Sequence, residues 1–113
     1  AYRLSELLSF QSHHDELTGL ANRKSLEARL AQVIESAQVE HTVHALAVFD
    51  LDQFKLVNDA GGSQAGDELL RQIGRVLKDE ARRRDTVARI GSDEFAVLLE
   101  DCPLPNAQRA VEA

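Results

Sequence analysis

Two short apolar runs flank a tight polar turn near the end of the chain, and this pattern constrains the fold more than any other. Residues 86–90 and 95–99 are rich in aliphatic, β-branched and aromatic side chains, which is typical of strands. Residues 91–94, with the sequence GSDE, have the composition of a turn. The sequence therefore predicts a β-hairpin with Asp93 and Glu94 at its tip.

A second group of carboxylates follows another apolar run. Residues 43–49 are apolar on both alternating faces, which predicts a central strand covered on both sides. That strand would deliver Asp50 to an edge of the sheet. Acidic residues also collect in turns simply because turns are solvated and Asp tolerates their backbone angles. Two strand ends that both offer hard oxygen ligands nevertheless favour a site for magnesium and phosphates.

Length and composition indicate one compact domain. The 113 residues, 43% hydrophobic and 28% charged, can form one core but hardly two. The net charge of -6 disfavours non-specific nucleic-acid binding, and it implies a bridging cation for any nucleoside triphosphate. A single cysteine, Cys102, and the lack of a long apolar stretch favour a cytoplasmic setting, although a larger parent protein could be membrane-anchored.

Helical periodicity predicts the remaining elements. A lead-in helix is expected over residues 2–14 and another over 106–112. Between them, two amphipathic helices present apolar stripes that are expected to face a core. The first begins near Asn22 and contains Leu26, Leu30, Val33, Ile34 and Ala37, and the second follows a glycine-rich loop and contains Leu69, Leu70, Ile73, Val76 and Leu77. This order predicts an α/β sandwich around a central, largely antiparallel sheet.

Four ordered motifs resemble those of GGDEF domains, whose active members are diguanylate cyclases that condense two GTP into cyclic di-GMP. Residues 15–23 resemble the family motif D-x-L-T-G-L-x-N-R, and residues 50–59 fit D-x-D-x-F-K-x-x-N-D. Residues 62–67 are close to G-H-x-x-G-D, and residues 89–95 are close to R-x-G-G-D-E-F. The resemblance covers most of the chain and implies the palm-like fold of nucleotide cyclases.

The resemblance also implies a division of the chain and two departures from the family pattern. Residues 1–14 would form a linker helix and residues 15–113 the GGDEF domain, with its C-terminal part missing because the family palm normally continues with another strand. Ser63 stands where the family usually has histidine, and Ser92 replaces the second glycine of the signature. If Ser92 must adopt a positive φ, it will strain or shift the turn.

The cofactor implied by the resemblance is Mg2+ (or Mn2+), and the substrate is GTP. Asp50 and Asp93 would ligate the metal with the backbone carbonyl of Leu51. Asp93 would also accept the proton of the attacking hydroxyl, assisted by Glu94. Lys55 would stabilise negative charge on the phosphates.

The substrate site implied by the resemblance includes residues from both glycine-containing motifs. Asn58 and Asp67 match positions that recognise guanine, because an amide can address the acceptor edge of the base and a carboxylate can accept from its N–H groups. Phe54, Gly91 and Ser92 would complete the contacts with the nucleotide.

A regulatory site is also implied. Arg82 and Asp85 match the family's R-x-x-D inhibitory motif, at which cyclic di-GMP acts as product and feedback inhibitor. The alternative is a basic helix C-terminus, in which residues 82–84 simply interact favourably with the helix dipole.

The resemblance implies a homodimeric diguanylate cyclase, since each subunit holds one GTP. A sensory domain would lie upstream and a phosphodiesterase-type domain could lie downstream. One alternative is a catalytically degenerate module that binds GTP or cyclic di-GMP and regulates an attached domain. A receiver-like domain with Asp50 as phospho-acceptor is a third reading, which the hairpin and the guanine-site pattern do not support.

Overall fold

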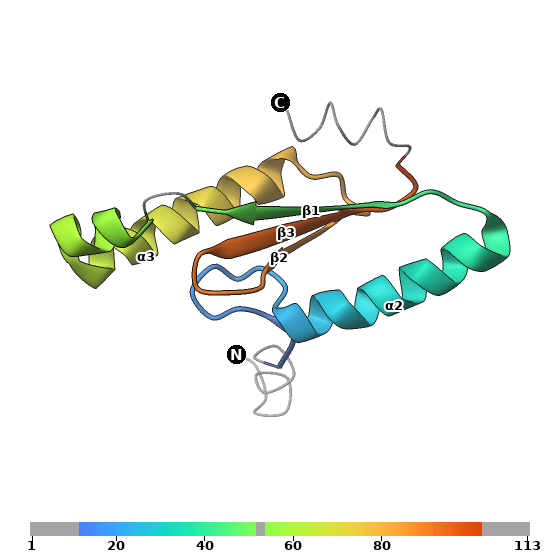
Figure 1. Ribbon diagram of the computed structural model, residues 1–113, viewed down its shortest axis with the longest axis horizontal. Coiled ribbons are helices and arrows are strands. Elements are labelled where there is room, and N and C mark those ends of the chain that lie inside the picture. The colour runs from blue at the N-terminus through green and yellow to red at the C-terminus, as the bar shows by residue number, and fades with distance from the viewer. Residues whose placement is uncertain (1–11, 52–53, 103–113) are drawn as a thin grey trace, which may run out of the picture.

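The computed structural model describes residues 12–51 and 54–102, which form a helix–sheet–helix sandwich (Figure 1). Its elements, in chain order, are α2 (Arg23–Glu40), β1 (Ala45–Asp50), α3 (Phe54–Glu80), β2 (Thr86–Arg89) and β3 (Glu94–Leu99). The sheet has the order β1-β3-β2, and both neighbouring pairs are antiparallel. The predicted α/β sandwich around an antiparallel sheet is therefore confirmed.

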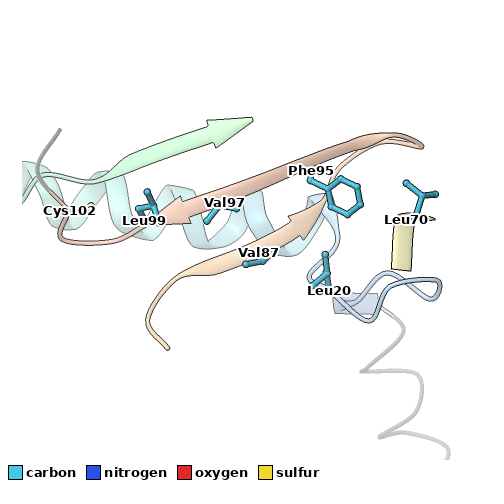
Figure 2. Packing of buried hydrophobic residues seen from close by; sticks show 7 residues of the cluster. All are labelled: Leu20, Leu70, Val87, Phe95, Val97, Leu99 and Cys102. Carbon is cyan, nitrogen blue, oxygen red and sulfur yellow. The ribbon is translucent and has the colours of Figure 1, made fainter. Parts of the chain in front are cut away.

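Strand β3 lies in the middle of the sheet, and its two faces pack against different helices. This follows from the two-residue period of a strand. One face contributes to a cluster with α3 and the loop before α2, made of Leu20, Leu70, Val87, Phe95, Val97, Leu99 and Cys102. The other face packs against α2 through Leu26, Val33, Ala88, Ala96 and Leu98. Figure 2 shows Phe95 between Leu70 and Leu20 at one end of the first cluster.

In the sheet formed by residues 12–51 and 54–102, strand β1 lies at an edge and one of its faces is exposed, contrary to the prediction of a central strand covered on both sides. Ala45 and Phe49 pack against the first cluster, but Leu46 and Val48 are 45% and 55% exposed. Within the described residues, no other strand pairs with the outer edge of β1. Apolar composition on both faces cannot reveal this, because cover on the second face depends on elements elsewhere in the chain.

Helix α2 begins where the sequence predicts. The Asn22 side chain accepts a hydrogen bond from the Ser25 N–H at 2.9 Å and caps the helix. The helix ends at His41, which has φ 59°. Leu26 and Val33 are buried, but Ile34 is 51% exposed, so the predicted apolar stripe only partly faces the core.

Helix α3 starts earlier than predicted, at Phe54. The expected glycine-rich loop is instead a kink at Gly62, whose φ of 77° and ψ of 177° separate two helical segments. Glycine reaches such a positive φ without steric cost, which explains the residue at the kink. In the second segment Leu70 is buried, but Val76 is 59% exposed, contrary to its assignment to the core stripe.

Of the predicted lead-in helix 2–14, the described residues Ser12 and His13 are helical and His14 is not. His14 forms an isolated β-bridge with Ala21 instead of extending a lead-in helix to that position. Residues 2–11 of the predicted lead-in and the predicted helix 106–112 lie outside the described residues. None of the helices in 12–51 and 54–102 has the length and hydropathy needed to span a membrane.

Candidate functional site

The two predicted groups of carboxylates meet at one end of the sheet. Because β1 and β3 are antiparallel, the last residue of β1 pairs with the first residue of β3, and these are Asp50 and Glu94. The Leu51 N–H then donates to the Asp93 carbonyl oxygen at 3.1 Å. Figure 1 shows the end of β1, the start of β3 and the start of α3 on this same side of the molecule.

The turn itself differs in one respect from the predicted hairpin tip. Glu94 is the first residue of β3, and its carbonyl accepts from the Ile90 N–H at 2.9 Å, so the tip consists of residues 91–93. Asp93 therefore lies on the turn as predicted, whereas Glu94 belongs to the sheet. The backbone of Glu94 is held by its pairing with Asp50 and by the hydrogen bond from Ile90.

Ser92 fits the turn without backbone strain. Within the described chain, the non-glycine residues with positive φ are His41 and Asp101, so Ser92 lies outside the left-handed region. The condition under which this serine would strain the turn is therefore not met. Ser92 is exposed, and its carbonyl oxygen accepts a hydrogen bond from Arg89 Nη2 at 2.8 Å.

The first turns of α3 contain three of the predicted nucleotide-site residues. Asn58 lies against Gly66, where a Cβ would collide with the Asn58 amide and come within 3.3 Å of the Phe54 ring. The kink in α3 thus brings the backbone next to Asp67 close to Asn58. Lys55 is exposed on the same helical segment.

Asn58 has one buried polar atom whose hydrogen-bonding capacity is not satisfied. Its Oδ1 is buried and has no hydrogen-bond partner in the described structure. Leaving such a group unsatisfied costs about 1–3 kcal/mol. This oxygen lies against Gly66, so a ligand could reach it only if the Asn58 side chain moved. Phe54, in contrast, packs against the first core cluster, which gives it a structural role in addition to any contact with a nucleotide.

The oxygen donors at the sheet end fit a hard divalent cation. Asp50, Asp93 and the Leu51 carbonyl provide the ligand type that Mg2+ and Mn2+ prefer. Among the residues that the structure describes, no three His, Cys, Asp or Glu side chains are clustered closely enough to hold a metal on their own.

Two residues of the site were given no role by the sequence, Asp15 and Arg89. Arg89 Nη1 lies 3.2 Å from Asp15 Oδ1, and the two side chains are 17% and 20% exposed. Asp15 Oδ2 also accepts from the Thr18 N–H at 2.9 Å and from the Thr18 hydroxyl at 2.8 Å. The spacing of Asp15 and Thr18 is a recognisable local signal for such a turn, but the pairing with Arg89 depends on the fold.

Asp15 is expected to make stability depend on pH. Burial alone raises the pKa of this carboxyl, but hydrogen bonds from Thr18 and the charge of Arg89 outweigh it, and the pKa is lowered from its ordinary value of 3.8. A group with a lowered pKa in the folded state stabilises above its unfolded-state pKa, and this contribution is lost as the pH falls through the folded-state pKa. In urea unfolding at several pH values, Asp15→Asn should therefore be destabilising above about pH 4, with a difference that shrinks at lower pH.

A matched control tests whether that effect is specific to Asp15. Glu27 pairs with Arg23 at an exposed position of α2, with side chains 63% and 71% exposed. Glu27→Gln should leave the curve of stability against pH close to that of the unmodified chain, because exposed pairs contribute little. Equal effects of the two substitutions would contradict the prediction.

The predicted inhibitory residues lie before β2, at the end of the sheet opposite to the turn. Arg82 Nη2 pairs with Asp85 Oδ1 at 2.9 Å, and the Asp85 side chain is only 1% exposed. Arg82 Nη2 also donates to the Glu100 carbonyl at 2.7 Å. The hydrogen bond with Asp85 raises the pKa of Arg82. The structure thus brings the two residues together as each other's partners, with the Arg82 side chain 46% exposed and the Asp85 carboxylate covered.

Comparisons with known proteins define the class. A model of the family described as "Diguanylate cyclase, GGDEF domain" matches residues 12–113. The chain therefore belongs to the GGDEF family. The similarity extends to proteins named as diguanylate cyclases, so the function of the family to which it belongs is related to cyclic di-GMP.

Individual relatives show how far the similarity extends. The chain is 45% identical over 101 residues to the probable diguanylate cyclase DgcE of Escherichia coli and 44% identical over 92 residues to the diguanylate cyclase TpbB of Pseudomonas aeruginosa. These alignments cover 89% and 81% of this chain but only 9% and 21% of the relatives. The chain thus spans a small part of the length of these curated relatives.

Solved structures agree with the fold. The diguanylate cyclase SiaD of Pseudomonas aeruginosa, in complex with its activator SiaC, matches with a TM-score of 0.87 and 38% identity over 96% of this chain and 42% of that one. DgcB of Caulobacter crescentus, solved as its coiled coil and GGDEF domain with c-di-GMP, matches with a TM-score of 0.91 and 31% identity over 96% and 56%. The predicted GGDEF fold is confirmed.

Proposed function

We propose that this GGDEF domain condenses two GTP into cyclic di-GMP and two pyrophosphates, with each subunit of a homodimer holding one GTP. The observation that supports this most directly is the pairing of Asp50 with Glu94 and of Leu51 with the Asp93 carbonyl at one end of the sheet. Because of this pairing, the end of β1 and the turn before β3 are neighbours, which supports a nucleotide site shared by the two segments. The similarity to named diguanylate cyclases supports the same reaction.

The reaction requires a base and a means to stabilise phosphate charge. The 3′-hydroxyl oxygen of one GTP forms a bond to the α-phosphorus of the other, the bond from that phosphorus to the bridging oxygen breaks, and pyrophosphate leaves. Asp93 accepts the hydroxyl proton. A second, symmetric transfer closes the ring. Asp50, Asp93 and the Leu51 carbonyl would hold Mg2+, which neutralises phosphate charge and stabilises the attacking and leaving oxygens when it is bound.

The remaining residues bind and orient the nucleotide. Exposed Lys55 is available to pair with the phosphates. The Asn58 amide donates to the acceptor edge of the guanine base, and Asp67 accepts from the N–H groups of the base. A site with such polar groups rejects a base that cannot satisfy them.

The whole protein has further proposed partners. Because the chain spans only part of its relatives, a sensory domain before it and a phosphodiesterase-type domain after it are proposals that rest on the family. Cyclic di-GMP is proposed to inhibit the enzyme at Arg82 and Asp85. Arg82, which is 46% exposed and contacts Asp85 and the Glu100 carbonyl, would be the first of the two to meet the product.

A product assay tests the proposed function. The full-length protein, incubated with GTP and Mg2+, should form cyclic di-GMP at a specific rate that rises with protein concentration, because two subunits must meet. Ser92→Gly should change the rate by less than about tenfold, since Ser92 needs no left-handed backbone and introduces no strain. GTP binding without any product at all protein concentrations would instead support the degenerate, regulatory module.

Gly66→Ala should weaken GTP binding. The added Cβ would collide with the Asn58 amide, so that side chain must move away from its present position. The loss of one well-placed hydrogen bond to the base predicts an affinity about tenfold lower in calorimetry with Mg2+ and GTP. Gln64→Ala, at an exposed position of the same helix, is the control and should bind normally. Unchanged affinity in Gly66→Ala would exclude Asn58 from the base-binding site.

A further inference from the structure

We propose that Arg89 is a positioning residue for the turn that contains Asp93, and that Asp15 holds Arg89 in place. This inference rests on the proposed function, because it assigns the two residues a role in the same reaction. Residues 15–20 form a turn, here called the Asp15 turn. The inference concerns the contact between this turn and the GSDE segment, residues 91–94, which is distant in sequence.

The Arg89 guanidinium joins the two segments directly. Its Nη1 donates to Asp15 Oδ1 at 3.2 Å, and its Nη2 donates to the Ser92 carbonyl at 2.8 Å. Arginine suits this task because its planar fork presents several donors at fixed angles. Arg89 Nε is buried without a partner in the described structure, so the contacts of the guanidinium that the structure shows are made by its two terminal nitrogens.

The Asp15 turn is itself anchored, so it can serve as a fixed support. Its carboxylate accepts from the Thr18 N–H and hydroxyl, and the Gly19 N–H donates to the Asp15 carbonyl at 2.8 Å. The residue after the turn, Ala21, exchanges hydrogen bonds with strand β2, with the Ala21 N–H donating to the Val87 carbonyl at 3.2 Å and the Arg89 N–H donating to the Ala21 carbonyl at 3.0 Å.

Packing adds to this anchoring. Leu20 is 5% exposed and belongs to the first core cluster, where it lies beside Val87 and Phe95 (Figure 2). The Asp15 turn also packs closely on α3, where a Cβ at Gly74 would come within 3.3 Å of Leu20 and 3.4 Å of Thr18. The Asp15 turn, which holds Arg89, is therefore packed directly against the hydrophobic core.

The position of Asp93 depends on two backbone contacts. On its C-terminal side, its own carbonyl accepts from the Leu51 N–H. On its N-terminal side, the preceding carbonyl, that of Ser92, is held by Arg89. Without Arg89, the exposed half of the turn would keep only its hairpin hydrogen bonds, and the Asp93 carboxylate would sample a wider range of positions. A displacement of about 1 Å at a reacting group can lower the rate about 100-fold.

The test compares kcat with KM in the full-length protein. Arg89→Gln should lower kcat for cyclic di-GMP formation about 10- to 100-fold, while KM for GTP changes less than about threefold, because the base-binding residues are untouched. Asp15→Asn should also lower kcat for cyclic di-GMP formation. The double substitution should resemble Arg89→Gln alone, because Asp15 acts through Arg89.

Two further variants separate positioning from stability. Arg29 forms a bidentate pair with Glu100, at 2.8 and 2.6 Å, away from the turn. Arg29→Gln therefore removes a comparable arginine pair and should leave kcat unchanged. Arg89→Lys retains the charge and one donor group, so it should recover part of the lost kcat and should fold even if Arg89→Gln does not. Equal losses of kcat in Arg29→Gln and Arg89→Gln, or an unchanged kcat in Arg89→Gln, would overturn the proposal.

A metal-binding readout distinguishes this proposal from the proposed function. If the unmodified protein makes no cyclic di-GMP, the proposed function fails, and Mn2+ affinity, measured by electron paramagnetic resonance in the presence of GTP, becomes the test. Arg89→Gln and Arg89→Lys should then both bind Mn2+ more weakly, with the glutamine variant about tenfold weaker. Mn2+ affinity equal to that of the unmodified protein in both variants would overturn the positioning role.

Discussion

Replacing Asp93 by asparagine is expected to lower the rate of cyclic di-GMP formation by about 1000-fold. The substitution removes the carboxylate that we propose as the acceptor of the hydroxyl proton and as a charged ligand for the cation. The backbone of Asp93 should stay in place, because the Leu51 N–H binds its carbonyl oxygen and not its side chain. Initial rates of product formation, compared with urea unfolding of the same sample, separate loss of chemistry from loss of fold.

Asp101→Asn is the matched control for this substitution. Asp101 is exposed, pairs with Arg84 at 3.4 Å and has φ 50°, a backbone conformation that asparagine also tolerates. The same change from carboxylate to amide at this position should leave the rate near that of the unmodified protein. If Asp93→Asn kept more than about a tenth of the activity, Asp93 could not be the base.

Phe95→Ala should produce the largest loss of stability. Phe95 is fully buried in the central strand and lies between Leu70 and Leu20 (Figure 2). Removing a buried aromatic ring costs about 3–5 kcal/mol, from the lost transfer free energy and the cavity left behind. Domains are stable by only about 5–15 kcal/mol, so the urea midpoint should fall steeply, and much of the protein could be unfolded in water.

Val48→Ala is the comparison for this loss. Val48 lies in the neighbouring strand β1, paired with Ala96, but its side chain is 55% exposed. The expected change in the free energy of unfolding is within about 1 kcal/mol. A large loss here, similar to that in Phe95→Ala, would mean that the exposed face of β1 is covered in the intact protein.

Much of the candidate site was predictable because it is encoded in local patterns. The hairpin followed from two apolar runs and a polar turn, and the start of α2 followed from a capping asparagine, Asn22, which the structure confirms as the N-cap. The meeting of Asp50 with the turn was an inference from strand ends, and antiparallel pairing of β1 with β3 does bring the two segments together.

Other features were not predictable, because they depend on contacts between distant segments. Whether β1 is central or at an edge depends on which strands pair with it, and its composition suited either arrangement. The glycines of residues 61–66 indicated a loop, but only a single residue, Gly62, leaves the helical region. The closed pair of Arg82 and Asp85 and the link between Arg89 and Asp15 involve side-chain geometry that spacing does not encode.

The amino-acid sequence was thus sufficient for the fold class, the hairpin and the start of α2, because periodicity, turn composition and motif spacing are local properties. The tertiary structure determined which side chains of the site are in contact. Asp15 and Arg89 are separated by most of the described chain, and they become partners only because the Asp15 turn docks on β2 through the backbone of Ala21. A long-range contact of this kind is selected by the packing of the whole core, and no short segment contains the information that specifies it.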